Sequence, residues 1–294
     1  DKWVFPTEAR SADPLPTEPR RGNPLTTHHL LLTRIKVTKT MKLRVLGCSG
    51  GIGGNLRTTS FLLDRDVLID AGSGVGELSL TELAAIDHVF VTHSHLDHIA
   101  SIPFMVDSVG FMRDQPLTVY ASEETLDILR QHIFNWKIWP DFSEIPNARQ
   151  PYMRYQPVKM GKAVVLNGRR ITPIPANHVV PAVGYHLDSG RASLVFSGDT
   201  TTNEAFWKVV NKIKNLRYLI IETAFSNSEK NLAMLSKHLC PSLLAEELVK
   251  FKSDAEVFIT HLKPGELELT MGEIEECVRG IRPRMLLNNQ EFEF

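Results

Sequence analysis

The stretch His93-Ser94-His95-Leu96-Asp97-His98 is the most informative part of this 294-residue chain. It places three imidazoles and a carboxylate within six positions, although the whole chain has only 11 histidines. The preceding residues 88–92 (His-Val-Phe-Val-Thr) are mostly apolar and β-branched, which predicts a buried strand. On an extended backbone His93 and His95 point to one side, and Asp97 and His98 then fall at the start of the next helix. Two such pairs of donors diverge, so they favour two adjacent metal ions over one and predict a dinuclear hydrolytic centre.

The composition limits the function classes. The chain is 43% hydrophobic and 23% charged, as globular proteins are. Lys+Arg (33) and Asp+Glu (34) nearly cancel, which argues against a long nucleic acid as substrate. The widely spaced Cys48, Cys240 and Cys277 form no CxxC motif, so we expect a reducing, cytoplasmic setting without disulfides or a thiolate metal site. No apolar run approaches the roughly 18 residues that cross a membrane, so no membrane association is expected.

The chain divides into two parts. Residues 1–40 contain five prolines and scattered charges but no apolar core of signal-peptide type, which predicts a flexible extension or leader. Met41 could be the natural start. Residues 41–294 are expected to form the catalytic domain.

Strand and helix patterns alternate in two similar halves from Met41 onward. Each half begins with strands and continues with helices, so the pattern predicts an α/β fold in which two β/α halves pack as a four-layer αββα sandwich. The expected strands are 42–46, 59–63, 67–70, 88–92, 117–121, 163–166, 171–175, 182–187, 193–197, 218–221 and 256–260. The expected helices are 96–111, 123–134, 203–213 and 241–252.

Four further donors stand just past the ends of predicted strands. They are Asp70, His178, Asp199 and His261. Loops at strand ends are held by a rigid scaffold, so functional side chains gather there. A turn or a helix cap is the alternative role for each, above all for Asp199 in Gly-Asp-Thr. Their recurrence at the same place in successive strands favours a common site.

The combined set resembles the metallo-β-lactamase superfamily over residues 41 to about 265. The resemblance implies the αββα metallo-β-lactamase sandwich and two divalent metal ions. It implies that one ion is held by His93, His95 and His178, the other by Asp97, His98 and His261, with Asp199 bridging them. Asp70 would order the ligand loop from behind. Nitrogen and oxygen donors suit Zn²⁺ first, with Mn²⁺ or Fe as alternatives, and His95 favours hydrolysis because an oxygen-binding di-iron member would tend to have Glu there.

Three segments and an insertion, one segment around His261 and the rest outside the ligand set, indicate the substrate. Residues 221–227 (Ile-Glu-Thr-Ala-Phe-Ser-Asn), 235–241 (Leu-Ser-Lys-His-Leu-Cys-Pro) and 259–264 (Ile-Thr-His-Leu-Lys-Pro), together with the insertion 135–142, resemble the class II 3′,5′-cyclic-nucleotide phosphodiesterases. This implies hydrolysis of cAMP or cGMP to the 5′-nucleotide. The chain departs from that pattern with Lys237 in place of Gly, Cys240 in place of Thr and Ala100 in place of Gly.

Three residues are expected to take part in catalysis. Asp97 would act as a metal ligand at the reacting phosphate. His238 is the candidate general acid or phosphate-orienting donor, since histidine transfers protons well near neutral pH. Its alternative role is at the start of the helix that begins at Pro241. Glu222 would hold His238 or a metal ligand; its alternative is a surface carboxylate at a strand end.

The substrate contacts are tentative. Trp136, Trp139 and Phe142 could form an aromatic wall on which a purine stacks, whereas core packing or a contact in a possible homodimer is the alternative. Backbone amides of the glycine-rich loop, at Gly51, could approach the phosphate. Asn203 is the remaining candidate contact.

Two other functions compete with this interpretation. A tRNase Z-like endoribonuclease shares the glycine-rich start, but that family has His-Glu-Ala-Thr where this chain has Ile221-Glu222-Thr223-Ala224, and no basic arm for tRNA is evident. A non-catalytic metal-binding protein of the same fold is the third candidate, and the complete ligand set argues against it.

Overall fold

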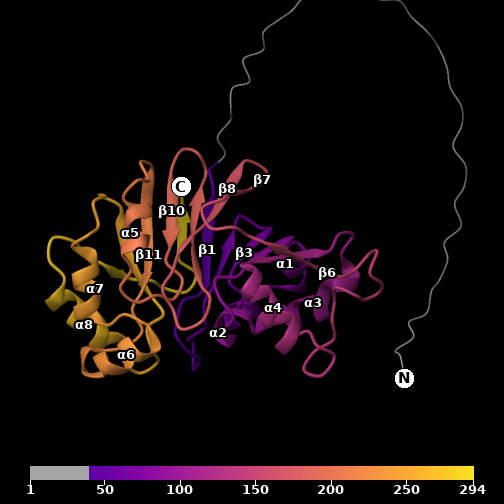
Figure 1. Ribbon diagram of the computed structural model, residues 1–294, viewed down its shortest axis with the longest axis horizontal. Helices are drawn as coiled ribbons and strands as arrows, with labels where there is room; N and C mark the ends of the chain where they lie inside the picture. Colours follow the sequence, from indigo (N-terminus) through magenta and orange to yellow (C-terminus); the bar gives the residue numbers. More distant parts are fainter. Residues whose placement is uncertain (1–39) are drawn as a thin grey trace, which may run out of the picture. The chain divides into compact units, whose positions relative to one another are not determined.

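The computed structural model describes residues 40–294, so the expected extension over residues 1–40 lies almost wholly outside the described part. Two seven-stranded sheets pack face to face, and helices cover the outer face of each (Figure 1). The αββα sandwich predicted from the sequence is therefore confirmed.

The first sheet has the strand order β14-β1-β2-β3-β4-β5-β6. Neighbours from β14 to β3 are antiparallel, and those from β3 to β6 are parallel. Its strands are β1 (Lys42–Gly47), β2 (Ser60–Leu63), β3 (Val67–Ile69), β4 (His88–Phe90), β5 (Leu117–Ala121), β6 (Met153–Pro157) and β14 (Glu291–Glu293).

The second sheet has the order β13-β12-β11-β10-β9-β8-β7. Neighbours from β7 to β10 are antiparallel and those from β10 to β13 are parallel. Its strands are β7 (Val164–Leu166), β8 (Arg169–Pro175), β9 (Val183–Asp188), β10 (Ser193–Phe196), β11 (Leu216–Glu222), β12 (Glu256–Thr260) and β13 (Arg284–Met285).

The helices divide between the two outer layers. The first sheet is covered by α1 (Leu80–Ala84), α3 (Ser101–Val109) and α4 (Glu123–His132), and the second by α5 (Glu204–Val210), α7 (Pro241–Leu248) and α8 (Leu267–Cys277) (Figure 1). Two short helices, α2 (Leu96–Ile99) and α6 (Lys230–Ser236), lie near the loops that follow the strands. Short 3₁₀ turns are η1 (Ser73–Glu77), η2 (Gly110–Met112) and η3 (Asn227–Glu229).

Alternate residues of the strands face different layers. In β3, Val67 and Ile69 belong to the core between the sheets, while Leu68 packs under the helices. In β11, Ile220 faces the central core and Ile221 the outer one. Successive side chains of a strand point to opposite faces, so strands buried on both faces are apolar throughout.

The single helix expected over 96–111 is wrong. It divides at Ala100 into α2 and α3, and its last residues form η2. Pro103 has no amide hydrogen and cannot bond to the carbonyl of Ile99, so the break falls one turn before it. Three other helices end earlier than expected, α4 at His132, α5 at Val210 and α7 at Leu248.

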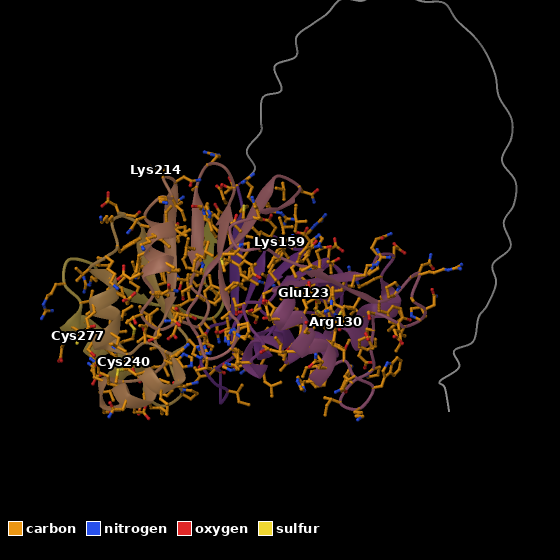
Figure 2. The ribbon with its side chains drawn as sticks, in the orientation of Figure 1. Glu123, Arg130, Lys159, Lys214, Cys240 and Cys277 are labelled. Atoms are coloured by element: carbon orange, nitrogen blue, oxygen red, sulfur yellow. The ribbon has the colours of Figure 1, made fainter. Side chains whose placement is uncertain are left out.

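The side chains in Figure 2 include cysteines on separate elements, and all three cysteines of the chain are free thiols. Glu123 and Arg130, both labelled on α4, form an exposed ion pair of 3.3 Å. Within residues 40–294, no helix has both the length and the apolar composition needed to cross a bilayer.

Arg169 links the two sheets. From β8 its guanidinium reaches the turn between β2 and β3 and donates two hydrogen bonds of 2.6 Å to the carboxylate of Asp66, with Asp64 3.2 Å away. Burial raises the pKa of Asp66, but the hydrogen bonds and charge of Arg169 outweigh it and lower that pKa. A carboxylate with a depressed pKa stabilises the fold above its unfolded pKa, and this contribution is lost as the pH falls through the folded value.

We therefore expect Arg169→Met to lower the free energy of unfolding by about 2–3 kcal/mol at neutral pH, because both carboxylates lose their partner. The difference from wild type should shrink as the pH falls below about 3.9, the ordinary pKa of Asp, and on through the lowered pKa that Asp66 has in the fold. Urea unfolding at both pH values measures it, with the exposed neighbour Arg170→Met as control. A pH-independent difference would show that the guanidinium contributes by packing alone.

Candidate metal centre

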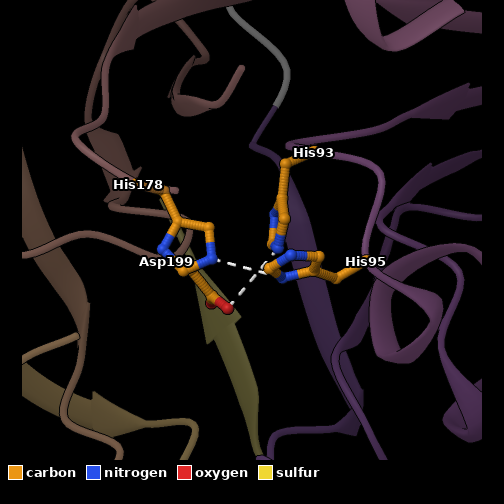
Figure 3. Close-up of side chains that lie close together, drawn as sticks. All are labelled: His93, His95, His178 and Asp199. Atoms are coloured by element: carbon orange, nitrogen blue, oxygen red, sulfur yellow. Dashed lines mark hydrogen bonds and ion pairs between the residues drawn. The ribbon is translucent and has the colours of Figure 1, made fainter. Parts of the chain in front are cut away.

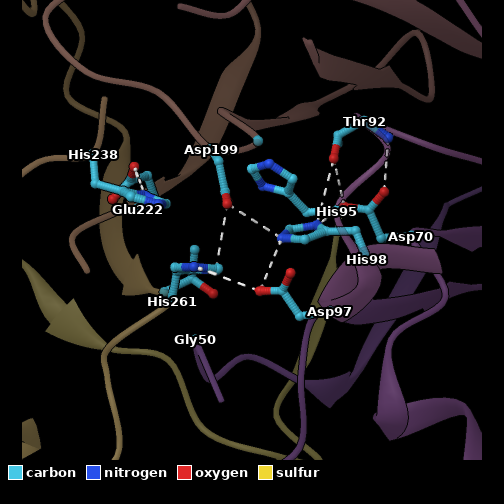
Figure 4. Close-up of polar contacts among 12 residues, drawn as sticks. Gly50, Asp70, Thr92, His95, Asp97, His98, Asp199, Glu222, His238 and His261 are labelled. Carbon is cyan, nitrogen blue, oxygen red and sulfur yellow. Dashed lines mark hydrogen bonds and ion pairs between the residues drawn. The ribbon is translucent and has the colours of Figure 1, made fainter. Parts of the chain in front are cut away.

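The candidate donors gather at one edge of the sandwich. Asp70 follows β3, the cluster His93–His98 follows β4, and His178, Asp199 and His261 follow β8, β10 and β12. These strands end at the same edge of their sheets, so loops distant in sequence meet there (Figure 4). Asp70 and His261 come directly after their strands, and His93, His178 and Asp199 lie three residues past theirs, so all are just beyond strand ends as the sequence indicated.

A first group of four donors surrounds one point (Figure 3). One donor atom each from His93, His95, His178 and Asp199 lies within 4.8 Å of the others. His178 Nε2 is 3.2 Å from His95 Nδ1, and His93 Nε2 is 3.5 Å from Asp199 Oδ2. These residues are those expected to hold the first ion, with Asp199 as the shared ligand.

A second group adjoins it. Donor atoms of Asp97, His98 and His261 also lie within 4.8 Å of one another. Asp199 Oδ2 is 3.4 Å from His98 Nε2, and its Oδ1 is 3.4 Å from His261 Nδ1 (Figure 4). The carboxylate of Asp199 therefore lies between the two groups, where a bridging ligand would have to be.

The donor set fits divalent metal ions. His93 Nε2, His98 Nε2 and His261 Nδ1 are buried and have no hydrogen-bond partner among residues 40–294. Buried polar atoms are normally paired, because leaving one unpaired costs about 1–3 kcal/mol. Imidazole nitrogens and carboxylates are ligands of Zn²⁺ and similar ions, so binding such ions would satisfy these atoms.

Asp70 orders the ligands from behind. Its fully buried carboxylate accepts hydrogen bonds from His98 Nδ1 at 2.7 Å, from the Thr92 amide at 2.7 Å and from the Thr92 hydroxyl at 2.9 Å. The Thr92 hydroxyl also lies 3.0 Å from His93 Nδ1. With Nδ1 held in this way, the Nε2 atoms of His93 and His98 face the donor groups, as in carboxylate–histidine–metal arrangements.

Burial keeps most of these imidazoles neutral. It lowers the pKa of His93 well below the usual value, that of His178 to about 4 and that of His261 to about 3. Neutral imidazole is the form that binds a metal, so at neutral pH these side chains are in the form that a metal site requires. Burial also lowers the pKa of His98, but the carboxylates of Asp199 and Asp70 outweigh it and raise that pKa well above its usual value.

The ligand loops contain unusual backbone conformations. Asp70 and His261 have positive φ, 57° and 66°, and Gly198, just before Asp199, has φ 62°. A Cβ at Gly198 would lie 2.7 Å from the carbonyl oxygen of Val183, so only glycine fits there. Strained conformations of this kind are concentrated at functional sites, where the surrounding structure enforces them.

Glu222 and His238 form a buried pair beside the donor groups. Glu222 Oε1 is 2.8 Å from His238 Nδ1 and also accepts the amide of Thr200 at 3.1 Å. His238, Asp199 and His261 make a third group of donors within 4.8 Å. Burial raises the pKa of Glu222. It lowers that of His238, but the charge of Glu222 outweighs it and leaves the pKa of His238 raised.

The alternative roles considered for this pair do not describe it. Glu222 is fully buried and is therefore no surface carboxylate. The residue that caps α7 is Cys240, two positions after His238.

The tentative substrate contacts have mixed outcomes. The three-residue aromatic wall is wrong, because Phe142 is buried in the outer core and Trp139 packs against that core and Phe104. Trp136 is 58% exposed. The side chain of Asn203 caps α5 through the amide of Phe206 and donates to the carbonyl of Pro175, so its partners are structural.

The glycine-rich loop lies against the last ligand. A Cβ at Gly50 would be 2.5 Å from the carbonyl oxygen of His261, and one at Gly51 would be 2.9 Å from the ring of Pro264. The glycines therefore allow the loop to pack on the segment of His261. The backbone N–H of Gly50 donates a hydrogen bond to the carbonyl oxygen of Leu262, so this N–H already has a partner within the protein.

Two residues at the site escaped the sequence analysis, Thr92 and Lys237. Thr92 was included in the expected strand 88–92, but β4 ends at Phe90. The position of this hydroxyl-bearing residue directly before the cluster His93–His98 was the signal in the sequence that could have indicated its role. Lys237 was noted only as a departure, and its contacts with His178 depend on a loop geometry that the local sequence does not show.

Asp70→Asn tests the arrangement behind the ligands. Asparagine tolerates the positive φ of this position, so the backbone should be retained. Loss of the charge that orients His98 should weaken metal binding about 10- to 100-fold. Chelator competition measures the affinity, and circular dichroism checks the fold. An unchanged affinity would show that Thr92 alone orders the loop.

The comparisons agree with this geometry. Residues 65–285 match the family model described as the beta-lactamase superfamily domain. A probable 3′,5′-cyclic-nucleotide phosphodiesterase of Yersinia pestis is 27% identical over 77% of this chain and 79% of its own. A ribonuclease Z of Clostridium beijerinckii is 24% identical over 76% and 75% of the two chains. The crystal structure of unliganded yeast PDE1 matches with a TM-score of 0.72 at 19% identity, over 86% of this chain and 99% of that one. The fold, the donor groups and the match over most of the described residues show that the chain belongs to the metallo-β-lactamase superfamily of metallo-hydrolases.

Proposed function

We propose that this protein hydrolyses 3′,5′-cyclic nucleotides, cAMP or cGMP, to 5′-nucleotides with two divalent ions, Zn²⁺ in the first instance. The observation that carries the proposal is the buried Glu222–His238 pair beside two adjoining donor groups. In the proposed reaction it would supply a proton donor beside the two donor groups. The Yersinia pestis relative, whose name is that of a cyclic-nucleotide phosphodiesterase, aligns over most of both chains.

Each residue has a definite part in this reaction. One ion would be held by His93, His95 and His178, the other by Asp97, His98 and His261, and both by Asp199. The chemistry that such ions supply is activation of water at neutral pH and neutralisation of charge on phosphate oxygens. The side chain of Asp97 is 29% exposed and those of His98 and His261 are buried, so the reacting phosphate would approach the second group from the side of Asp97.

His238 would complete the step. Water loses a proton to solvent as its oxygen bonds to phosphorus, the P–O3′ bond breaks, and O3′ must gain a proton as it leaves. The Nδ1 atom of His238 is engaged by Glu222, so Nε2 is the atom left to donate that proton. The buried carboxylate of Glu222 fixes the ring and stabilises its protonated form.

Ribonuclease Z activity is the competing function. One sequence difference between this chain and the tRNase Z family does not separate the two functions. The His that precedes Glu in the tRNase Z segment corresponds to Ile221, which faces the outer core and not the donor groups. That difference therefore leaves the chemistry of the site unchanged. The size of the substrate separates cyclic-nucleotide hydrolysis from tRNA cleavage better.

No basic arm projects from the described residues to hold a tRNA. The longest stretch without regular structure, residues 133–152, contains two basic and two acidic side chains. It is anchored by the buried rings of Phe134 and Phe142. A small anionic substrate is consistent with this surface, since grip on long RNA requires an excess of positive charge.

The test is turnover of cAMP and cGMP beside a pre-tRNA with a 3′ trailer, with metal analysis of the same sample. We expect release of the 5′-nucleotide and no cleavage of the pre-tRNA. Cleavage of the pre-tRNA alone would replace the proposal with the ribonuclease. Bound metal without turnover of either substrate would refute both.

A further inference from the structure

Lys237 ends α6 in the left-handed conformation, with φ 54°. Its amide donates to the carbonyl of Met234 at 3.3 Å, and the next amide, of His238, donates to that of Ala233 at 2.8 Å. These two bonds make the Schellman motif, in which glycine is the usual residue at the left-handed position. A Cβ disfavours this conformation, so the lysine needs a compensating interaction.

Both polar ends of Lys237 contact one candidate ligand, His178. The carbonyl oxygen of Lys237 lies 3.0 Å from His178 Nδ1, and its ammonium donates to the carbonyl oxygen of His178 at 3.1 Å. His178 stands in the loop after β8, where no strand partner holds its backbone. One contact therefore fixes the ring and the other fixes the backbone that bears it.

We propose that Lys237 is a positioning residue that holds His178 in ligand geometry from both sides. Donation from Nδ1 to the Lys237 carbonyl sets the tautomer in which Nε2 is free to bind a metal. Glycine at this position would supply the same carbonyl without strain but could not supply the ammonium. The proposal rests on the metal centre of the proposed function and is independent of the nucleotide substrate.

Substitutions at this position separate the ammonium from the backbone strain. Lys237→Gly removes both, Lys237→Ala removes the ammonium and keeps the strain, and Lys237→Arg keeps a cation. Competition of the full-length apoprotein with a chromophoric chelator for Zn²⁺ gives the affinity. Thermal unfolding of the same apoprotein gives the stability.

We expect the Gly and Ala variants to bind Zn²⁺ about 10-fold more weakly than wild type, as when a partner behind a ligand is lost. The Gly apoprotein should nevertheless melt about 2–4 °C higher than the Ala apoprotein, because it has no left-handed strain. The Arg variant should stay within about threefold of wild-type affinity, since its guanidinium can donate to the same carbonyl. The Zn²⁺ affinity would thus depend on whether residue 237 has a cationic side chain. The melting temperature of the apoprotein would depend on whether that residue has a Cβ.

A matched control is available at Asn167, which has φ 51° in the exposed turn between β7 and β8. Asn167→Gly removes a side chain from a left-handed position away from the donor groups, and its Zn²⁺ affinity should equal that of wild type.

The proposal would be overturned if Lys237→Gly bound Zn²⁺ as tightly as wild type does. It would also be overturned if the Zn²⁺ affinities of the variants changed in parallel with their melting temperatures. Failure of the wild-type apoprotein to bind Zn²⁺ would remove the metal centre on which it rests. Zn²⁺ binding without turnover of cyclic nucleotides would count against the proposed substrate alone, and the Lys237 comparison would stand.

Discussion

Replacement of Asp97 by alanine is expected to lower kcat for cyclic-nucleotide hydrolysis by at least about 10³-fold. Asp97 is the one carboxylate of the second donor group, and without it that group consists of His98 and His261 beside the shared Asp199. Metal clamping of a phosphate supplies several kcal/mol, and each 1.4 kcal/mol is a factor of about ten in rate. Metal analysis should show weaker binding of the second ion, up to the loss of one ion per chain, because that site keeps only three of its four protein ligands and loses the one carboxylate that it does not share.

This variant suits the test because it should fold. The side chain of Asp97 is 29% exposed and follows the N-cap of the short helix α2, so its removal leaves no buried charge unpaired. Asp107→Ala, which removes an exposed carboxylate from α3, is the matched control and should retain full activity. Wild-type turnover in Asp97→Ala would contradict the assignment of the second group.

The ligand positions could be predicted because they depend on local order. Each of Asp70, His178, Asp199 and His261 follows an apolar run. Strands β8, β10 and β12 run in the same direction, so the residues that follow them meet at one edge. The strands themselves were recognisable for the same reason, since Val67–Ile69 and Glu256–Thr260 are apolar runs bounded by polar residues.

The elements that escaped prediction depend on distant partners. The polar segment Glu291–Glu293 becomes a strand only because Leu43 pairs with Phe292 at the opposite end of the chain. Met153–Pro157 has little apolar character and is ordered as the edge neighbour of β5. Helices α1, α6 and α8 and strand β13 were likewise not expected, because each is short or lacks a clear apolar face and takes its order from packing.

The same limit applies within the site. The sequence indicated that Glu222 would hold either His238 or a metal ligand, and only the fold shows that the partner is His238, because β11 and the loop after α6 are brought together by packing. Phe142 was a candidate for a stacking wall, with core packing as the alternative, and the structure places it in the core. Aromatic residues are buried more often than not, so a place in an insertion does not by itself indicate an exposed ring.

His238→Ala gives the second large effect, a fall in kcat of about 10²- to 10⁴-fold, which is the range for loss of a general acid. Metal content should stay at the wild-type level, because the two donor groups of seven side chains are complete without His238. His132→Ala, at the exposed end of α4, is the control for loss of a histidine as such. Loss of metal in His238→Ala would instead assign His238 to ligation, through the third donor group with Asp199 and His261.

Glu222→Gln then separates a proton donor from an orienting group. The amide keeps the size of the carboxylate but removes the charge that favours protonated His238, so it should lower kcat by lowering the fraction of protonated His238. A substrate with a good leaving group needs no proton at the departing oxygen. For a p-nitrophenyl phosphodiester, His238→Ala and Glu222→Gln should therefore lose much less of the wild-type rate than they lose for cAMP. Equal losses for both substrates would mean that the pair positions the phosphate, since orientation is needed whatever group leaves.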